Sequence, residues 1–562
     1  MRLFLLFFML LLVTAWAEPS EKPRQQARSM VISKFGIVAT SQTLASAAGA
    51  HILEQGGNAI DAAIAANAVL GVVEPVSNGI GGDLFAIVYE AKSGRLHGLN
   101  ASGCAPSGLT IDFLETRGMR GMPQEGIYSV TVPGCVAGWE ALRKKYGRLE
   151  FSKLLAPAIY YAENGIPITE IISASWRQSV EVLSAHPNSK ETFLPEGRAP
   201  KVGDVFRNPD LALSLRRIAE RGRDGFYRGA TAEAILQISQ ENSGTFNPSD
   251  LTEFEPEWVE PISTSYRGWT VYELPPNGQG VAALSMLNLM ERFPLEEYGH
   301  NSAKALHVMI EAKKLAYADM LQYVGDPRFS KVPVKAMLSK ELAEQRAYLI
   351  FPEKASCRVT PTDLTGISHS YGGDTIYMSA IDREGNIVSL IQSNYMGFGS
   401  GLVPPKTGFM LHNRGALFTL ERGKPNSLEP RKRPLHTIIP AFMEKESVRI
   451  GFGIMGGWNQ AQAHAQFVSN IVDFGMNIQE ALEAARFTKP TFDGCDVLVE
   501  DRMPEKVRNT LLQWGHEVRV LGPFSGSMGG GQAVMRDRTG INYGGSDPRK
   551  DGAAAPENPS WR

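Results

Sequence analysis

The sequence predicts a large layered fold in which helices and strands alternate along the chain, and three observations support this prediction. Hydrophobic residues make up 43% and charged residues 21% of the 562 residues, which is ordinary for a globular protein. Ala-rich segments carry apolar residues at helical spacing. Short runs rich in β-branched and aromatic residues lie between turn residues, which is typical of strands.

The first 17 residues predict a secretory signal peptide. Arg2 supplies positive charge, the run 3–13 is apolar, and small residues at Ala15 and Ala17 precede a cut before Glu18. The apolar run is shorter than the about 20 residues that a membrane-spanning helix needs. We therefore expect cleavage of residues 1–17 and an exported protein, periplasmic or secreted, without a stable membrane span.

Two Ala-rich helices are expected near the start of the mature chain, at 45–55 and 58–73. Gly56-Gly57 ends the first helix, and Asn58 caps the second. A glycine-rich turn then leads into a buried strand at 84–89. The later elements expected in chain order are a strand at 267–274, helices at 303–324 and 335–350, a strand at 448–452, helices at 460–473 and 478–485, and a hairpin of 532–536 with 541–543.

The segment 359–374 differs from its surroundings because it is rich in Ser, Thr, Gly and Pro and has little to bury. We expect it to be exposed and flexible. A hairpin follows at once, with strands at 375–381 and 387–393 around a turn at 382–386. In this register Thr375, the first residue of the hairpin, faces Ser393.

The junction between Asp374 and Thr375 suggests a specific chemistry. Cleavage of the backbone there would give Thr375 a free α-amino group, whose pKa of about 7.7–8.0 suits a base near neutral pH. The hydroxyl of the same residue would be the nucleophile. The alternative is an ordinary threonine that opens an ordinary strand.

Several classes of function lack support in the sequence. Lys and Arg total 57 against 59 Asp and Glu, and this net charge of −2 argues against nucleic-acid binding. No G-x-S-x-G, H-E-x-x-H or C-x-x-C motif occurs, so we expect no metal and no cofactor. The four cysteines, Cys104, Cys135, Cys357 and Cys495, are too few for a disulfide scaffold, and their spacing leaves the pairing open.

The glycines Gly451, Gly453 and Gly456 fit the pattern G-x-G-x-x-G after a strand. A dinucleotide-binding loop would also need an acidic residue about 20 positions on, and Asp473 lies near that distance but within a helical pattern. Two other interpretations are a tight turn from strand to helix and a pocket of backbone N–H groups for an anion.

An ordered set of motifs spans nearly the whole chain after residue 17. It comprises GGNAIDAAIAANAVLGVVEPVSNGIGGDLFAIVY at 56–89, VTVPGCVAGWEAL at 130–142, ELPPNGQG at 273–280, EAKKLAYAD at 311–319, DTIYMSAIDREGNIVSLIQS at 374–393, FGSG at 398–401, KRP at 432–434, MGG at 455–457 and GGSDPR at 544–549. With this set, the chain resembles the gamma-glutamyltranspeptidase (glutathione hydrolase) family of N-terminal nucleophile hydrolases.

The resemblance implies an α+β fold, a four-layer αββα sandwich, formed by two chains from one precursor. The precursor would cleave itself between Asp374 and Thr375 into a large subunit, 18–374, and a small catalytic subunit, 375–562, which together form one layered domain. Thr375 would attack a gamma-glutamyl amide, the backbone of Gly456 and Gly457 would form the oxyanion hole, and Ser393 would support the nucleophile. Water or an amine of an amino acid or peptide would then accept the acyl group.

The chain departs from the family's pattern where the substrate is bound. Ser102-Gly103-Cys104 precedes the Ala-Pro pair that usually follows an Arg for the glutamyl carboxylate. Asn413 matches the family, but Arg414 replaces a Gln and Leu417 replaces the Asp that pairs with the substrate ammonium. His436-Thr437 stands where the family has a Ser-Ser pair after the KRP motif. The residues expected to bind substrate are Asn413, Arg414, His436 and Thr437.

Arg414 has two interpretations, a clamp for a carboxylate or a solvated loop residue. The sequence accordingly supports three functions. The first is a gamma-glutamyltranspeptidase that acts on glutathione and related compounds. The second is an amidase or acylase of the same fold for other dicarboxylate acyl amides or poly-gamma-glutamate. The third is an exported binding protein that kept the scaffold without the activity.

Overall fold

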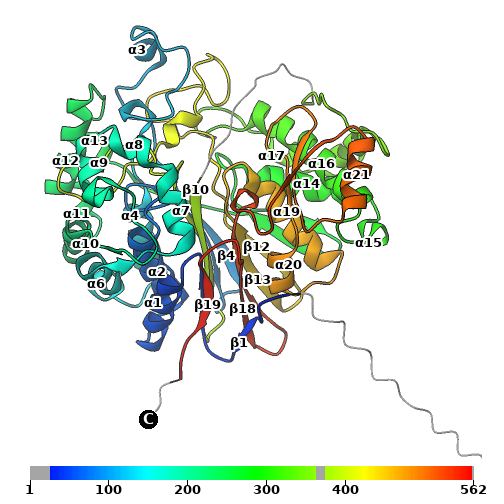
Figure 1. The fold of residues 1–562 in the computed structure, drawn as a ribbon, viewed down its shortest axis with the longest axis horizontal. Coiled ribbons are helices and arrows are strands. Elements are labelled where there is room, and N and C mark those ends of the chain that lie inside the picture. The colour runs from blue at the N-terminus through cyan, green and yellow to red at the C-terminus, as the bar shows by residue number, and fades with distance from the viewer. Residues whose placement is uncertain (1–25, 363–373, 560–562) are drawn as a thin grey trace, which may run out of the picture.

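The computed structural model describes residues 26–362 and 374–559, and two antiparallel seven-stranded sheets form its centre (Figure 1). The strands of the first sheet, in spatial order, are β1 (Val31–Ser33), β18 (Asn542–Ser546), β17 (Gly531–Arg536), β13 (Val448–Ile454), β12 (Ala441–Lys445), β9 (Trp269–Glu273) and β8 (Ile262–Tyr266). Those of the second are β19 (Ala553–Pro556), β2 (Ile37–Thr40), β10 (Asp374–Ile381), β11 (Ile387–Tyr395), β3 (Asp83–Glu90), β4 (Arg95–Ala101) and β7 (Glu257–Val259).

The expected hairpin forms the middle of the second sheet. Strands β10 and β11 lie between β2 and β3, which come from the beginning of the chain. All residues of β11 are buried, because this strand has neighbours on both edges and packing on both faces. Strands from before and after the Asp374–Thr375 bond therefore lie side by side in one sheet and share one core.

The two sheets pack face to face through a common apolar cluster. Phe85, Tyr377 and Ile391 of the second sheet contact Phe442 and Val534 of the first in this cluster. Gly453 in β13 permits the close approach, since a Cβ there would come within 2.3 Å of the ring of Tyr377. Gly451 and Gly453 lie inside a strand that is paired on both edges, so the dinucleotide-loop interpretation of these glycines is wrong.

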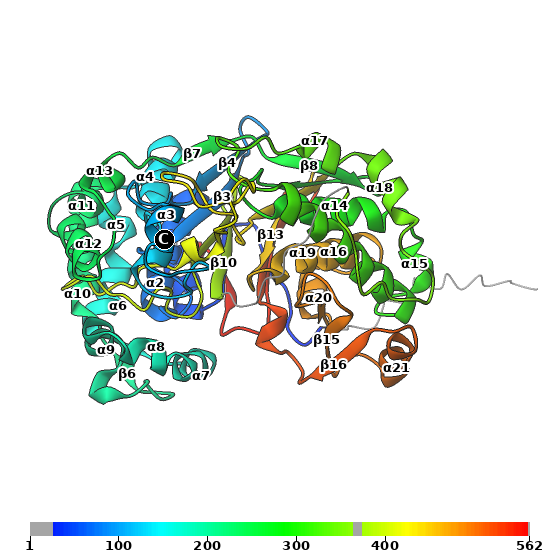
Figure 2. The ribbon, with the colours of Figure 1, turned by 90° about the horizontal axis from the view of Figure 1, so that it is seen from above.

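Helices cover the outer face of each sheet (Figure 2). Beside the second sheet lie α1 (Thr43–Glu54), α2 (Ala59–Val73), α4 (Cys135–Tyr146), α6 (Ala156–Asn164), α7 (Glu170–Gln178), α10 (Pro209–Arg221) and α12 (Gly229–Glu241). Beside the first lie α14 (Gly280–Met290), α16 (Ala303–Tyr323), α18 (Lys340–Ala347), α19 (Asn459–Val472), α20 (Ile478–Glu483) and α21 (Glu505–Gln513). A small sheet of β14 (Phe487–Thr488), β15 (Asp496–Glu500) and β16 (Glu517–Leu521) lies next to α21.

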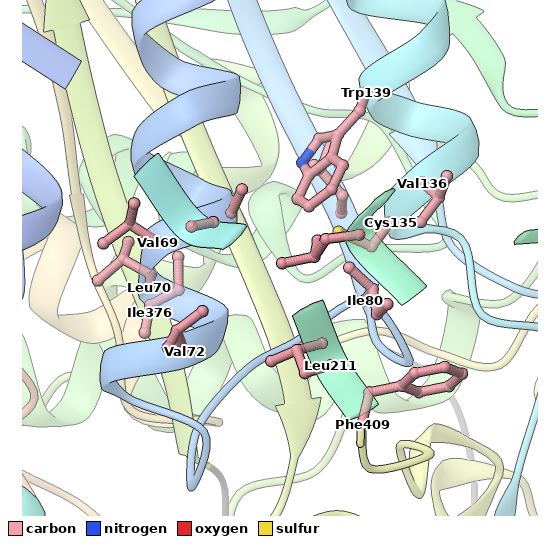
Figure 3. Packing of buried hydrophobic residues seen from close by; sticks show 14 of the residues in the cluster. Val69, Leu70, Val72, Ile80, Cys135, Val136, Trp139, Leu211, Ile376 and Phe409 are labelled. Carbon is pink, nitrogen blue, oxygen red and sulfur yellow. The ribbon is translucent and has the colours of Figure 1, made fainter. Parts of the chain in front are cut away.

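Helix α2 supports the hairpin from behind. Asn58 caps it, as expected, and forms a capping box with Asp61. Nearly every residue of α2 is buried, and its apolar side chains, Val69 and Leu70 among them, belong to the same cluster as Ile376 of β10 (Figure 3). This packing fixes the strand that carries Thr375 at its beginning.

Some expectations need correction. The helix expected at 335–350 is broken, because Ser339 caps a new helix, α18, by accepting a hydrogen bond from the N–H of Leu342. Asp374 belongs to β10 rather than to the flexible segment. Thr362, within that segment, is held by the carboxylate of Asp319 at 2.8 Å. The cysteine pairing that the sequence left open is Cys357 with Cys495.

Two expectations fall outside the described residues. These are the signal peptide at 1–17 and most of the flexible segment, 363–373. Among the helices that the structure describes, none combines the length and apolar character required to cross a bilayer.

Candidate active site

The hydroxyls of Thr375 and Ser393 lie 3.1 Å apart at one end of the hairpin. From Ile376 to Ile381 the register is the expected one, with Ile376 opposite Gln392. A bulge at Thr375 shifts it, so that Asp374 pairs with Tyr395. The bulge turns Thr375 away from strict cross-strand pairing, yet its side chain, 2% exposed, still donates a hydrogen bond to Ser393.

The Ser393 hydroxyl has a fully defined set of hydrogen bonds. It accepts from Thr375 and from the backbone N–H of Tyr395 at 2.8 Å. It donates to the carbonyl oxygen of Asp374 at 2.8 Å. Ser393 therefore links the Thr375 hydroxyl with the carbonyl of the peptide bond that precedes Thr375.

Gly456 and Gly457 form the turn from β13 to α19. Their φ values of +124° and +59° lie in the region that favours glycine, so this turn suits these residues. Gln279 donates to the carbonyl of Gly457 at 2.9 Å and holds the turn in place. Neither glycine's N–H has a hydrogen-bond acceptor among the described residues. The end of the glycine motif is therefore a tight turn from strand to helix, and the backbone N–H groups of Gly456 and Gly457 remain available as hydrogen-bond donors.

A cavity of about 510 Å³ connects the glycine turn with the hairpin. Asp374 and Gly456 both line it, together with polar side chains that include Asn459, Ser527 and Lys550. Burial raises the pKa of the Asp374 carboxyl, and the positive charge of Lys550 opposes this effect. Asp374, which precedes Thr375, and Gly456 of the glycine turn thus border a common space.

A buried charge cluster lies beside Ser393. Asp83 on β3 pairs directly with Ser393 on β11. Its carboxylate lies 2.9 Å from Nε2 of His436, 3.3 Å from Nδ1 of His412 and 3.6 Å from Nε of Arg414, and all four side chains are fully buried. The backbone N–H of Gly103 adds a further hydrogen bond to the Asp83 carboxylate, at 2.9 Å.

The protonation states in this cluster follow from burial and charge. Burial alone would raise the pKa of Asp83, but His412 and His436 outweigh it and hold that pKa well below its usual range. Burial, with Arg414 nearby, lowers the pKa of His436 to about 3. Burial also lowers the pKa of Arg414 to about 10, which still leaves it charged at neutral pH. Asp83 and Arg414 therefore form the ion pair, and His436 is a neutral hydrogen-bond donor.

The structure brings three of the four expected substrate-binding residues together. Arg414 donates to Thr437 at 2.7 Å and lies over the ring of Tyr395. His436 contacts the same oxygen of Asp83, Oδ2, that lies near the guanidinium of Arg414. The solvated-loop interpretation of Arg414 is wrong, since its side chain is fully buried. Nη2 of Arg414 has no hydrogen-bond acceptor in the described part of the chain.

Asn413, the fourth residue, has local partners instead. Its side-chain oxygen accepts from the N–H of Met396 at 3.1 Å, and its amide donates to the carbonyl of Gln124 at 2.6 Å. These bonds fix the chain just after β11. Leu417, in place of the family's Asp, is an apolar side chain packed against the core.

The position of the missing Arg is occupied differently. Ser102 is buried and bonded to Asn100 at 2.8 Å, and the guanidinium of Arg433 donates to the Ser102 carbonyl at 3.3 Å. Cys104 is partly exposed as a free thiol, and Nη2 of Arg328 lies 3.5 Å from its sulfur.

Sequence reasoning missed Asp83 and His412 as members of the site. Asp83 closes the motif Gly81-Gly82-Asp83, and a Cβ at Gly82 would come within 2.5 Å of the carbonyl oxygen of Ser393. The sequence did offer a signal for Asp83, because this acidic residue follows two glycines, and glycines in such a place often mark the close approach of another strand. His412 carried no such signal, because its partners, Asp83 and Thr131, are far away in the sequence.

One further cluster has metal-ligand chemistry, namely His307, Glu311 and His516. The two histidines are 2.8 Å apart and hydrogen-bonded to each other, and Lys314 lies 2.6 Å from Glu311. The ammonium of Lys314 already neutralises the carboxylate of Glu311. We therefore interpret this cluster as a buried polar network rather than as a metal site.

A threonine hydroxyl hydrogen-bonded to a serine, close to a cavity that a glycine turn also lines, is an arrangement found in enzymes that transfer acyl groups. The comparisons identify the family. The gamma-glutamyltranspeptidase profile matches residues 45–557, and the chain belongs to this family of hydrolases and transferases.

Relatives within the family differ in their described activities. The chain is 37% identical to the glutathione hydrolase-like YwrD proenzyme of Bacillus subtilis over 93% of this chain and 99% of that protein. It is 33% identical to the glutathione hydrolase proenzyme of Escherichia coli over 92% and 91%. The crystal structure of a cephalosporin acylase from Bacillus halodurans superposes with a TM-score of 0.88, 43% identity and coverage of 96% and 99%.

Proposed function

We propose that the protein is a self-cleaving gamma-glutamyltranspeptidase or glutathione hydrolase of the N-terminal nucleophile type, with an αββα sandwich shared by two chains. The observation that carries the proposal is the contact of Thr375, Ser393 and the Asp374 carbonyl at the edge of a cavity. The fold supports it, because two facing sheets with helices outside hold both segments in one core.

Self-cleavage would begin with attack of the Thr375 Oγ1 on the carbonyl carbon of Asp374. The Ser393 hydroxyl, bonded to the Asp374 oxygen, stabilises the negative charge that develops there. The proton of the Thr375 hydroxyl passes to the amide nitrogen as the C–N bond breaks, and the acyl group moves from nitrogen to oxygen. Hydrolysis of the resulting ester by water leaves a carboxylate on Asp374 and a free α-amino group on Thr375.

The same residue would then act on substrate. Its α-amino group, with a pKa of about 7.7–8.0, takes the proton from Oγ1 as the oxygen attacks a gamma-glutamyl amide. The free N–H groups of Gly456 and Gly457 stabilise the oxyanion. The amine leaves with a proton, and water or the amine of an amino acid or peptide releases the acyl group.

Recognition of the acyl donor would involve the buried cluster. Arg414 has a donor without an acceptor and a charge only partly balanced by Asp83 at 3.6 Å, which suits it to a carboxylate. Thr437 and His436 hold the guanidinium and the Asp83 carboxylate in place. We propose Asn413 as a residue that positions this loop rather than one that discriminates substrates.

A second candidate is an amidase or acylase of the same fold for dicarboxylate acyl amides without the α-amino group, or for poly-gamma-glutamate. The replacement of the ammonium-binding Asp by Leu417 favours it, because a leucine carries no negative charge that could pair with an ammonium. The similarity to a cephalosporin acylase supports it as well.

The test combines size and turnover. Intact-mass measurement of wild type and Thr375→Ala should give two chains, ending at Asp374 and beginning at Thr375, for wild type only. One uncut chain in both would defeat the proposal. Comparable rates on gamma-glutamyl and glutaryl anilides would select the second candidate, and a single release event per chain would already exclude the binding-protein function.

We also propose that the protein is exported. The pattern of residues 1–17 supports this, and so does the disulfide between Cys357 and Cys495, since disulfides persist in oxidising compartments. Mass measurement of the N-terminus of the large chain tests it, with Glu18 expected as the first residue.

A further inference from the structure

The disulfide between Cys357 and Cys495 joins the two sides of the candidate processing site. Cys357 precedes the Asp374–Thr375 bond in the sequence and Cys495 follows it. We propose that the mature enzyme is a covalent heterodimer whose large and small subunits are linked by this bond. The inference rests on the proposed self-cleavage, because without a cut the bond would close a loop within one chain.

The contacts around the bond show that it belongs to a built interface. The carbonyl of Cys357 accepts from the N–H of Gly494 at 2.8 Å. Two residues earlier, the N–H of Ala355 donates to the carbonyl of Trp514 at 2.7 Å. Cys495 in turn accepts from Glu517 at 2.7 Å. Backbone hydrogen bonds on both sides of the sulfurs therefore fix their positions in the folded chain.

The large-subunit side of this interface is also anchored to helix α16. Lys314 donates to the carbonyl of Ser356 at 3.0 Å, and the carboxylate of Glu311 accepts from the Ser356 N–H at 3.3 Å. Both side chains are almost fully buried. The disulfide thus links α16, through segment 355–357, to the small sheet of β14, β15 and β16.

The two cysteine residues differ in exposure. Cys495 is 1% exposed, whereas Cys357 is exposed to solvent. Because Cys357 is the exposed residue of the pair, we expect a small thiol to approach the link from that side. The two other cysteines, Cys104 and Cys135, stay free, and Cys135 is buried.

The chemistry of the link balances in two separate steps. Formation of the S–S bond removes two protons and two electrons from the thiols, which a disulfide-bearing oxidant of the exporting compartment accepts. Hydrolysis of the Asp374–Thr375 bond involves no electrons and leaves the S–S bond intact. The subunits then remain one covalent species until a thiol reduces the link.

Denaturing gels of the purified full-length protein, with and without reductant, test this directly. We expect wild type to run as one species without reductant and as two chains with it. Thr375→Ala should run as one chain in both lanes. Cys357→Ser and Cys495→Ser should give two chains in both, whereas Cys104→Ser, a matched control, should behave like wild type.

The outcomes separate the two proposals. One chain for wild type in both lanes means that self-cleavage fails. Two chains for wild type without reductant means that cleavage occurs and the covalent link is wrong. Because a cysteine variant could misfold, the decisive lanes are those of wild type, supported by mass spectrometry of the unreduced peptides, where a Cys357–Cys495 peptide pair is expected and its absence would overturn the link.

Discussion

Ser393 on β11 stands directly opposite Asp83 on β3, so the hydroxyl that contacts Thr375 and a buried carboxylate share one end of the sheet. Antiparallel partners point to the same face. Thr375, Ser393 and the carboxylate of Asp83 thus lie on three adjacent strands, β10, β11 and β3.

Ser393 should affect self-cleavage first. Ser393→Ala removes the hydroxyl that donates to the Asp374 carbonyl at 2.8 Å, and loss of one such donor slows acyl chemistry by about 100-fold or more. Ser393→Thr keeps the hydroxyl and should stay within about tenfold of wild type. Time courses of the uncut chain measure both, and equal rates for Ala and Thr would contradict the assignment.

Gly456 should matter through its N–H and its backbone conformation. A Cβ at φ +124° would meet Gly529 at 3.3 Å, so Gly456→Ala should shift the turn and its donors. We expect kcat to fall by about 100-fold to 1000-fold. Gly423→Ala is a matched control, since Gly423 also has a positive φ but open space around it. If both variants lose the same activity, the effect is not specific to the cavity.

Leu417 should decide whether the donor needs an α-amino group. Leu417→Asp restores the counter-charge expected from the family's pattern. It should raise the ratio of kcat/KM for gamma-glutamyl over glutaryl anilides by about tenfold, which corresponds to about 1.4 kcal/mol. Leu417→Asn, of the same shape without the charge, should leave the ratio near that of wild type. An unchanged ratio in the Asp variant would place the ammonium elsewhere.

Acid should destabilise the protein through histidines that fold in the neutral form. Burial lowers the pKa of His436, His464 and His516 to about 3 from the ordinary 6.5. Below pH 6.5 the unfolded chain takes up protons that the folded chain excludes, so this contribution to stability is complete above pH 6.5 and is lost as the pH falls toward 3.

Each such histidine can contribute a slope of about 1.4 kcal/mol per pH unit in that window. Urea unfolding between pH 7.5 and 4 measures the slope. His436→Asn removes one of the groups and should flatten the curve. A free energy of unfolding that stays constant over this range would show that the histidines are protonated in the folded protein.

The sequence was sufficient for the local parts of the structure. The hairpin around 382–386, the capped helix α2 and the turn at Gly456-Gly457 each depend on neighbouring residues, and their bounds fell close to those expected. The ordered motifs also identified the family, which the profile match bears out. The roles of Thr375 and of the oxyanion glycines stay predictions until they are tested.

Only the tertiary structure decided which distant residues meet. Asp83 joins His412, His436 and Arg414 because β3 and two loops converge beside Ser393. Cys357 meets Cys495 because segment 355–357 hydrogen-bonds both to α16 and to the residues around the small sheet. Such contacts depend on the packing of whole layers and leave no periodic trace in the chain. Burial then decided between the two interpretations of Arg414 that the sequence left open, since it makes this side chain a buried partner of Asp83 rather than a solvated loop residue.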